Sequence, residues 1–391
     1  MIYIDSSHLH EFLKVGKPLS GIQRVTLNCL VGLWRVFGTE QVRALVFFMP
    51  EKSYKSCRVE DFLHGGGRHE LQLYPCSFSK GDKVLLSEYF WNSAVTAAAS
   101  RHETFGQAQV FRMIYDVIPL AMPRLFAWSW VRKFRRYVRD AISSADVVLT
   151  NSQFSVGDIE KFFPALEFKT PIRIVKLPHE FLGVEDVLAE FAAPHTKQLN
   201  QSLKPTGAEA LRSLHYVLVV GSLEARKNQQ AVMAAWNLLY AKYGEKLPKL
   251  VLVGSITSHN WFYKRRMRKG IEANPKILHL KGVNDEGLRW LYRNCLFSLF
   301  PSNYEGWGLP IGESLWCGRP VLSGTSTSLP EVGGDLVTYA DPNDQPAFIA
   351  AIEKMLFDGD YLAQLISKIS GAKLRSWNDV ITVLAGIIKP V

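Results

Sequence analysis

Two hydrophobic patterns alternate along this chain. Short apolar runs, such as those at 83–86 and 216–220, have the length of buried strands, and the stretches between such runs place apolar residues at helical spacing. Further strands are expected at 3–5, 42–49, 110–115, 147–150, 172–175, 249–253, 277–280, 296–300, 320–323 and 336–339. Strands that alternate with helices predict parallel sheets between layers of helices, which is a doubly wound α/β fold.

The alternation is interrupted once. The stretch 187–214 is polar, contains two prolines and has no clear strand, so we interpret it as a linker with an extra helix. We therefore expect one Rossmann-like domain at 1–186 and a second at 215–373. An amphipathic helix is expected within 374–391. A length of 391 residues also favours two domains over one core.

Composition excludes several classes of protein. An apolar fraction of 47% fits globular domains, and no apolar run reaches the ~20 residues that span a bilayer. The first residues resemble a short strand without a basic region, so no signal peptide is expected. The five cysteines are scattered without a Cys-x-x-Cys, which predicts free thiols and no metal site. These features together predict a cytoplasmic protein.

The net charge of +10 is concentrated in two places that also hold aromatic residues. The predicted helix 126–139 carries five cations together with the aromatic residues Phe126, Trp128, Trp130 and Phe134, and 261–269 mixes the two kinds again. Such a helix either contacts the inner face of an anionic membrane or buries its aromatic residues and leaves its cations in water. For 126–139 both interpretations stay open, and for 261–269 the buried one is favoured. No nucleic-acid motif accompanies either cluster.

The most informative chemistry lies between a predicted strand and a helix expected at 309–316. Two carboxylates, Glu305 and Glu313, flank a turn that contains Gly306 and Gly308. Glycines allow a close backbone approach, and the first N–H groups of a helix have no partner within it, which suits a diphosphate. The carboxylates could accept hydrogen bonds from the sugar and the ribose of a nucleotide-sugar. Alternatively, Glu305 caps the helix and Glu313 is solvated.

These residues resemble a known family. The spacing Glu-x7-Glu, the run 318–321, the run 328–332 and the upstream segment 219–228 are similar to retaining glycosyltransferases of family 4. The resemblance covers 217–344 as an ordered set. It implies the GT-B fold, in which two doubly wound Rossmann-like domains face each other across a cleft. It also implies that the C-terminal helix crosses back to the N-terminal domain.

The resemblance implies a role for each matching residue. Arg226 and Lys227 would neutralise the leaving diphosphate in place of a metal ion, Glu305 would hold a sugar hydroxyl, and Glu313 would hold the ribose. The other residues that it places near the donor or its phosphates are Gly21, Arg24, Gly221, Val283, Gly306, Trp307, Gly308 and Leu309. Arg24 could pair bidentately with a phosphate or an anionic acceptor.

One position departs from the family. Many members carry a His-Asp pair after the strand at 110–115, whereas this chain has Tyr115 followed by Asp116. Asp116 could assist the acceptor or could cap the turn before Pro119. Because the leaving phosphate of retaining members is usually assigned the acceptor proton, the missing histidine does not argue against activity. The Asp-x-Asp at 358–360, a metal motif in another fold, is better explained as the end of a helix.

The resemblance thus implies a retaining, metal-independent glycosyltransferase without a cofactor. It would move a hexosyl group, with mannose from GDP-mannose favoured, from a GDP- or UDP-sugar to a glycan or lipid-linked glycan in bacterial surface-polysaccharide synthesis. An alternative is a nucleotide-sugar epimerase of the same fold, for which Asp116 and His179 would be the acid–base candidates. Another is an inactive subunit that binds a sugar nucleotide.

Overall fold

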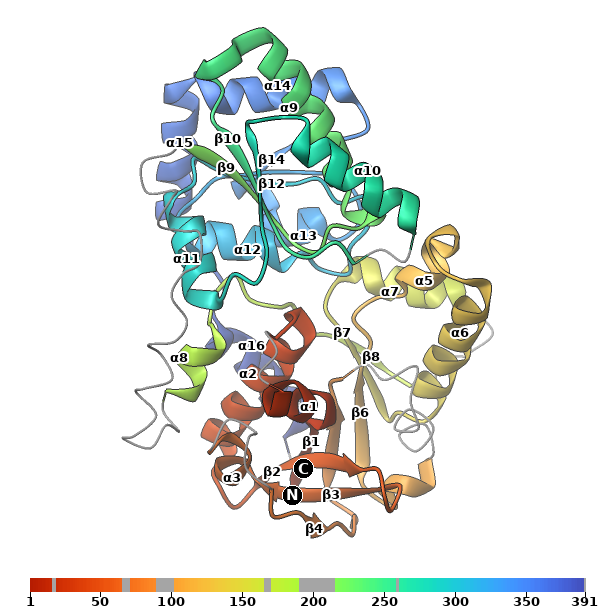
Figure 1. Ribbon diagram of the computed structural model, residues 1–391. Helices are drawn as coiled ribbons and strands as arrows, with labels where there is room; N and C mark the ends of the chain where they lie inside the picture. Colours follow the sequence, from red (N-terminus) through yellow and green to blue (C-terminus); the bar gives the residue numbers. More distant parts are fainter. Residues whose placement is uncertain are drawn as a thin grey trace. The chain divides into compact units, whose positions relative to one another are not determined.

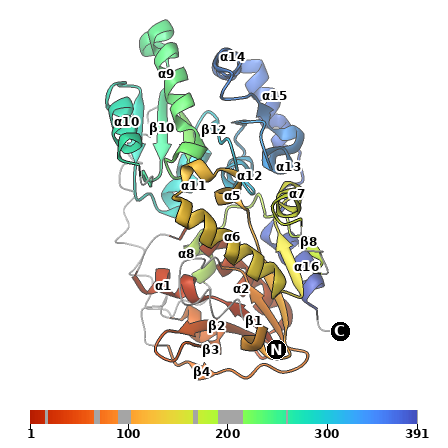
Figure 2. The same cartoon turned by 90° about the vertical axis from the view of Figure 1, so that its right-hand side faces the viewer.

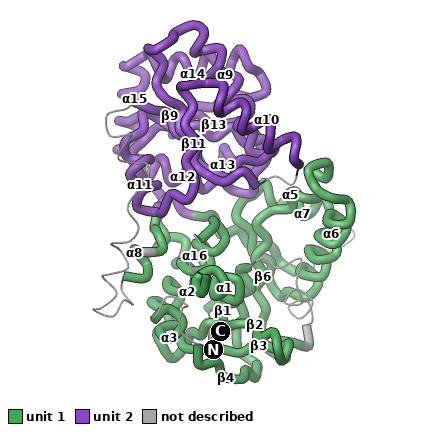
Figure 3. Tube along the Cα trace, in the orientation of Figure 1, with its two compact units in different colours: residues 1–177, 182–200, 376–391 green, residues 178–181, 201–375 purple. Residues whose placement is uncertain are grey.

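The protein is represented by a computed structural model that describes residues 1–15, 19–64, 71–88, 102–164, 170–189, 215–257 and 260–389. It divides into two compact units, coloured separately in Figure 3. Unit 1 comprises 1–177, 182–200 and 376–391, and unit 2 comprises 178–181 and 201–375. Most of the linker predicted at 187–214 lies outside the described residues. Among those residues, no helix is both long and apolar enough to cross a bilayer.

Unit 1 is built on a mixed sheet whose strand order is β4-β3-β2-β1-β5-β6-β7-β8 (Figure 1). The strands are β1 (Ile2–Asp5), β2 (Val42–Phe48), β3 (Ser53–Arg58), β4 (Tyr74–Pro75), β5 (Lys83–Leu86), β6 (Gln109–Met113), β7 (Val147–Thr150) and β8 (Ile172–Ile174). The six strands expected in this half are present and parallel, whereas β3 and β4 form an antiparallel edge that was not predicted. Polar residues dominate β3, so its hydrophobic pattern is weak.

The helices of unit 1 come from both ends of the chain. They are α1 (Ser7–Val15), α2 (Gly21–Phe37), α3 (Val59–Leu63), α5 (Ile118–Ala121), α6 (Trp128–Ser143), α7 (Gln153–Phe162), α8 (Val184–Leu188) and α16 (Trp377–Ile388). Helix α16 packs against α2, although more than 300 residues separate them in the sequence. The contact is tight, because a Cβ added to Gly32 of α2 would lie 2.4 Å from Ile381 of α16.

Unit 2 contains an entirely parallel sheet with the order β11-β10-β9-β12-β13-β14. Its strands are β9 (Tyr216–Val220), β10 (Lys249–Val253), β11 (Ile277–Leu280), β12 (Ser298–Phe300), β13 (Val321–Ser323) and β14 (Thr338–Tyr339). Its helices are α9 (Gln229–Tyr243), α10 (Trp261–Glu272), α11 (Asp285–Asn294), α12 (Leu309–Trp316), α13 (Leu329–Gly333), α14 (Gln345–Phe357) and α15 (Gly359–Ser370) (Figure 2).

The alternation of side chains along β9 explains why helices cover both faces of this sheet. Val217 and Val219 pack in one buried cluster with residues of α9 and α14, whereas Tyr216 and Leu218 pack in another with residues of α11. Successive side chains of a strand point to opposite faces, so a continuous apolar strand requires a helix layer on each side. The prediction of two doubly wound α/β units is confirmed.

The strand order of this sheet changes direction between β9 and β12. From β9 the chain proceeds to β10 and β11 on one side, and then returns to β12 on the other side of β9. The segments that follow β9 and β12 therefore leave neighbouring strands toward helices on opposite faces. Ligands of open α/β sheets bind at such a switch point, beyond the carboxyl ends of the strands.

The packing of α16 on α2 yields a prediction about stability. Replacing the buried Ile381 with alanine should lower the free energy of unfolding of unit 1 by about 2–4 kcal/mol, because it leaves a cavity beside Gly32. Val383 of the same helix is 49% exposed, so Val383→Ala is a matched control. It should change the free energy of unfolding by less than about 0.5 kcal/mol. Urea denaturation followed by circular dichroism measures both. Equal effects of the two variants would contradict this account of α16.

Candidate active site

Two loops meet at the switch point of unit 2. The 3₁₀ turn Ala225–Lys227 follows β9, and residues 301–308 follow β12. Hydrogen bonds join the loops in both directions: the Asn303 N–H donates to the Arg226 carbonyl at 2.8 Å, and the Arg226 guanidinium donates to the Tyr304 carbonyl at 2.9 Å. The loops are therefore held as one structure, although their sequences are far apart.

The carboxylate of Glu305 is the centre of this structure. Its side chain is only 8% exposed and lies 2.7 Å from the Arg226 guanidinium and 2.7 Å from the Lys227 ammonium. The Ser302 hydroxyl donates to the same carboxylate at 2.7 Å. A buried carboxylate is tolerated only when cations and donors satisfy it in this way. The structure thus brings together three of the four predicted catalytic residues.

The surroundings of Glu305 keep it ionised. Burial by itself would raise the pKa of this carboxyl, but the Lys227 ammonium and the Arg226 guanidinium lower the pKa to about 2. Arg226 also contacts Glu224 at 2.8 Å, so two carboxylates share the two cations. The contacts with Arg226, Lys227 and Ser302 occupy three of the roughly four acceptor positions of the Glu305 carboxylate. One acceptor position is left for another donor.

Two residues after β13 fix the turn between Glu305 and α12. The Ser328 hydroxyl lies 2.9 Å from the carbonyl of Glu305 and 2.9 Å from that of Trp307, and the Thr327 hydroxyl accepts the Glu305 N–H at 3.1 Å. Gly308 has φ +118°, which glycine adopts without strain, and it precedes the first turn of α12. The backbone of this turn therefore requires glycine at position 308.

The N-terminus of α12 offers fewer free donors than the sequence suggested. Pro310 in the first turn has no N–H, and the Ile311 N–H donates to the Gly308 carbonyl at 3.0 Å. A different donor is present beside it, since the indole Nε1 of the buried Trp307 has no hydrogen-bond partner among the residues described. The Arg375 guanidinium lies 5.9 Å from the centre of the same ring.

Glu313 lies within α12 and is 4% exposed. The buried hydroxyl of Tyr292 on α11 donates to its carboxylate at 2.9 Å. Glu313 is therefore not a solvated helix residue, and Glu305 does not cap α12, whose N-cap is Gly308. The structure thus contradicts the alternative in which Glu305 caps the helix and Glu313 is solvated, whereas the roles of both carboxylates toward a donor stay predictions.

The glycine after β9 is positioned by close backbone packing. Gly221 has φ +140°, and Gly254, which follows β10, has φ +141°. A Cβ on Gly254 would lie 2.2 Å from the Gly221 carbonyl oxygen, so no larger residue fits there. A Cβ on Gly221 would lie 3.7 Å from the Lys227 side chain. Gly221 thus borders one of the site's two cations, as its place in the predicted site requires.

Val283 is half-buried and lies between β11 and α11. It packs against the cluster that contains Leu288 and Leu291 of α11, and the next residue, Asn284, caps α11 by accepting the Gly287 N–H at 2.9 Å. This loop is fixed from both sides, which suits recognition through its backbone. Its contact with a nucleobase stays a prediction.

Two predicted residues, Gly21 and Arg24, lie in the first turn of α2 in unit 1. The side chain of Gln23 accepts the Ser20 N–H at 3.1 Å and lies 2.9 Å from the His8 ring on α1. Glu88, after β5, in turn accepts the backbone N–H groups at the start of α1. Hydrogen bonds therefore link Ser20 and the first turn of α2 through α1 to the residue Glu88 after β5.

Asp116 has a structural partner in unit 1. Its carboxylate accepts the Ile118 N–H at 3.0 Å, which is the turn-capping role that the sequence left open beside an acceptor role. Tyr115, which stands where family members often have histidine, is buried, and its hydroxyl donates to the Ser87 carbonyl at 2.8 Å. Burial raises the pKa of this phenol well above its ordinary value, so Tyr115 stays neutral.

His179, the other acid–base candidate of the epimerase interpretation, has both ring nitrogens engaged within unit 2. Its Nδ1 accepts the Arg375 N–H at 2.9 Å, so Nε2 holds the proton and donates to the Val332 carbonyl at 3.0 Å. Burial lowers the pKa of the ring. Asp358, the first residue of the Asp-x-Asp, accepts the Tyr361 N–H at 2.9 Å and caps α15.

Sequence reasoning missed the residues that support the site. Ser302, Thr327, Ser328 and Tyr292 all bind a predicted site residue or its backbone, and none of them was singled out as a site residue. Ser328 begins the run 328–332 that resembles the family, so its hydroxyl and that of the adjacent Thr327 could have been proposed as supports of the site. Tyr292 left no such signal, because it resembles any other core residue of an amphipathic helix.

Comparisons with known proteins show which family this chain is similar to. The model of the family "Glycosyl transferases group 1" matches residues 211–370. The O-antigen chain mannosyltransferase B of Escherichia coli is 30% identical over 269 residues, which are 68% of this chain and 67% of that protein. The serotype-specific mannosyltransferase WbdA of Escherichia coli is 27% identical over 255 residues, which are 64% of this chain but only 29% of WbdA.

Solved structures share the fold at low sequence identity. The crystal structure of HepE from Anabaena, in complex with UDP and glucose, has a TM-score of 0.66 and 14% identity over 100% of this chain and 99% of its own. The structure of WaaG, a glycosyltransferase involved in lipopolysaccharide biosynthesis, has a TM-score of 0.60 and 14% identity over 100% of both chains. These likenesses identify the architecture as the GT-B fold.

The ion pairs of Glu305 predict a pH dependence of stability. A carboxyl whose pKa falls from 4.5 in the unfolded chain to about 2 in the folded one stabilises the native state above pH 4.5, and this contribution disappears as the pH falls toward 2. The contribution of this pKa shift to the free energy of unfolding is about 3 kcal/mol at neutral pH. Glu305→Gln should therefore destabilise unit 2 at pH 7, and the difference from wild type should shrink below pH 4.5. Urea denaturation at several pH values measures it; a constant difference would contradict the ion pairs.

Proposed function

The chain belongs to the group 1 glycosyl transferases and is a glycosyltransferase, and from this premise we propose the reaction that it catalyses. It transfers a mannosyl group from a nucleotide-sugar, GDP-mannose, to a hydroxyl of a bacterial surface polysaccharide or its lipid-linked precursor, with retention at the anomeric carbon. The observation that supports this most directly is the buried Arg226–Lys227–Glu305 cluster at the switch point of unit 2.

The donor site follows from the charges of this cluster. Without donor, Glu224 and Glu305 neutralise Arg226 and Lys227. A diphosphate beyond β9 and β12 would compete for these two cations, which are already desolvated and fixed. Fixed positive charge acts most strongly on the growing charge of a leaving diphosphate, so the cluster lowers the barrier without a metal ion.

The remaining groups of the site fit the sugar and the ribose. Glu305 has one acceptor position left, which suits a hydroxyl of the transferred sugar. Glu313, held by Tyr292 about one turn into α12, suits the ribose hydroxyls. In the transfer, the bond between the anomeric carbon and the phosphate oxygen breaks, and a bond to the acceptor oxygen forms on the same face. The acceptor proton moves to the leaving phosphate, so no separate base is needed.

The identity of the sugar rests on the relatives. Both Escherichia coli proteins named above are mannosyltransferases, and the chain matches about two thirds of the length of one of them. The epimerase alternative is not favoured, because His179 is held by backbone groups on both ring nitrogens. The inactive-subunit alternative is not favoured either, since Glu305, Arg226 and Lys227 are present together and correctly paired.

The proposal predicts both a donor and a sensitivity to mutation. The full chain should release GDP from GDP-mannose when given a mannose-terminated acceptor, and nuclear magnetic resonance of the product should show the anomeric configuration of the donor. Lys227→Ala should lower kcat/KM by at least about 10²-fold, or ~2.7 kcal/mol of transition-state stabilisation. The exposed Lys246 of the same unit provides the matched control Lys246→Ala, which should retain wild-type activity.

Four results would contradict parts of this proposal. Isomerised nucleotide-sugar without an acceptor would support the epimerase, and donor binding without turnover would support the inactive subunit. Activity that is lost with a chelator and restored by Mn²⁺ would show that the cations of the cluster do not replace a metal. Turnover of a UDP-sugar in place of GDP-mannose would correct the donor and leave the site unchanged.

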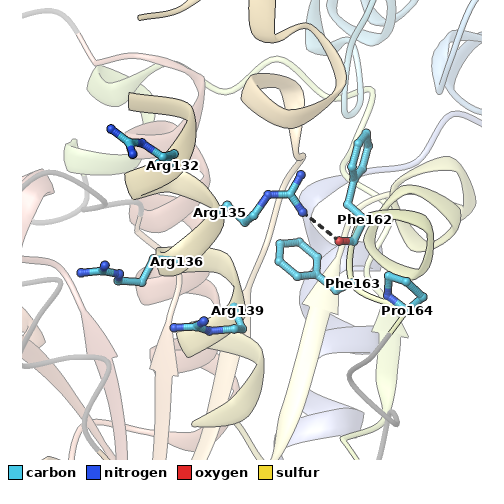
Figure 4. Close-up of a pocket in the computed structure, with 7 residues that line it drawn as sticks. All are labelled: Arg132, Arg135, Arg136, Arg139, Phe162, Phe163 and Pro164. Carbon is cyan, nitrogen blue, oxygen red and sulfur yellow. Dashed lines mark hydrogen bonds between the residues drawn. The ribbon is translucent and has the colours of Figure 1, made fainter. Parts of the chain in front are cut away.

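We also propose that α6 of unit 1 contacts an anionic membrane, where a lipid-linked acceptor would lie. The aromatic residues predicted to share one helix do not act as a group: Phe134 of α6 is buried and Phe126, which precedes α6, packs on the same core, whereas Trp128 of α6 is 67% exposed. Figure 4 shows Arg132, Arg136 and Arg139 on one side of the helix. Trp128 lies four residues before Arg132, so its exposed side chain and the three arginines lie on the same face of α6.

The row of arginines yields a vesicle-binding prediction. Arg132→Gln/Arg136→Gln/Arg139→Gln should weaken binding to anionic vesicles by about 10²-fold at low salt, since each cation near such a surface adds roughly 1 kcal/mol. Arg135 is kept, because it donates to the Phe162 carbonyl at 3.3 Å. Lys52→Gln/Arg58→Gln/Lys80→Gln removes three exposed cations elsewhere in unit 1 and should have little effect. Equal co-sedimentation of both variants would exclude α6 as a docking element.

A further inference from the structure

The start of helix α10 in unit 2 exposes two large aromatic side chains. Trp261 is 59% exposed and Phe262 is 76% exposed, and their rings contact edge to face with centroids 5.1 Å apart. The sequence interpretation, in which the aromatic residues of 261–269 are buried, is therefore wrong for these two. Adjacent exposed aromatic residues form a contiguous apolar tip, which indicates an interaction surface more strongly than a single exposed residue does.

The rest of α10 is strongly basic. After the tip the helix carries five cations before its first acidic residue, Glu272. They are Lys264, Arg265, Arg266, Arg268 and Lys269. None of the five has an ion-pair partner within the part of the chain that the structure describes, and the Arg265 guanidinium instead lies 5.3 Å from the centre of the Trp261 ring. The helix is thus a concentration of uncompensated positive charge next to an apolar tip.

The packing of α10 against unit 2 explains why its aromatic tip and its cations face outward. Met267 is the one fully buried side chain among its described residues. Gly270 lies directly over α9, since a Cβ there would be 2.3 Å from Met233. The helix is therefore held along the side that contains Met267 and Gly270. Asn260 fixes its first turn by accepting the Tyr263 N–H at 3.2 Å, which sets the orientation of the tip.

We infer that α10 docks unit 2 on an anionic lipid membrane, with Trp261 and Phe262 inserted at the level of the headgroups. Aromatic side chains are favoured at that depth, and clustered cations are attracted by the surface potential of anionic lipids. A second copy of the chain is a poor occupant, because pairing this face with itself would bring two sets of five cations together. The inference is independent of the donor chemistry and of α6.

The test compares variants of the full chain on mixed phosphatidylglycerol–phosphatidylcholine vesicles at low salt. Trp261→Ala/Phe262→Ala should weaken binding at least about tenfold, because it removes the apolar surface that inserts. Leu238→Ala alters another apolar residue of unit 2 that is 58% exposed, and it should bind as wild type. Arg265→Gln/Arg266→Gln/Lys269→Gln should weaken binding and reduce its salt dependence. The exposed lysines 246, 354 and 373 give the matched control Lys246→Gln/Lys354→Gln/Lys373→Gln.

Insertion has its own readout. Brominated lipids quench tryptophan fluorescence when the indole enters the bilayer, and Trp261→Phe keeps an apolar tip while removing this one fluorophore. The variant should bind as wild type but lose a large part of the quenching. The idea is overturned if Trp261→Ala/Phe262→Ala binds vesicles like wild type, or if Trp261→Phe is quenched as strongly as wild type. It is also overturned if sedimentation shows that the aromatic tip holds copies of the chain together in solution.

Discussion

The site depends on one buried carboxylate and the two cations that satisfy it. Glu305 belongs to the loop after β12, and Arg226 and Lys227 belong to the turn after β9, so their ion pairs join two segments that the chain reaches separately. Removing either partner would leave a buried charge uncompensated, which costs several kcal/mol. The same pairs that hold these loops together keep the cations fixed and desolvated, which is the state in which they can act on a leaving diphosphate.

The sheet order of unit 2 explains why the cluster forms at this place. β9 and β12 are neighbours, and the chain leaves them in opposite directions. The space beyond their carboxyl ends is therefore not covered by a crossover helix and stays open to a ligand. Because Gly221 and Gly254 have no side chains, the loops after β9 and β10 approach each other closely at this edge of the sheet.

The two units differ in how they use charge. In unit 2 the buried carboxylates Glu305 and Glu313 lie in the candidate site, whereas in unit 1 Asp5 and Glu88 are buried around the start of α1 and hold its backbone. Burial is the largest influence on both of these carboxyls and raises the pKa of each, whereas the Lys227 ammonium and the Arg226 guanidinium lower the pKa of Glu305. The contrast distinguishes carboxylates that organise backbone from one that is kept ionised.

Sequence alone determined the alternation of strands and helices and the helix at 309–316, since these depend on local periodicity. The ion pairs of Glu305 with Arg226 and Lys227 join segments that are far apart in the sequence, so only the tertiary structure shows them. The sequence left the edge strand β3 unpredicted, because polar residues in an edge strand carry little pattern. Only the tertiary structure decided that Glu313 is buried under Tyr292, that Asp116 caps a turn, and that Trp261 and Phe262 face solvent. Burial depends on which elements pack together, and the pattern of one helix does not specify its neighbours.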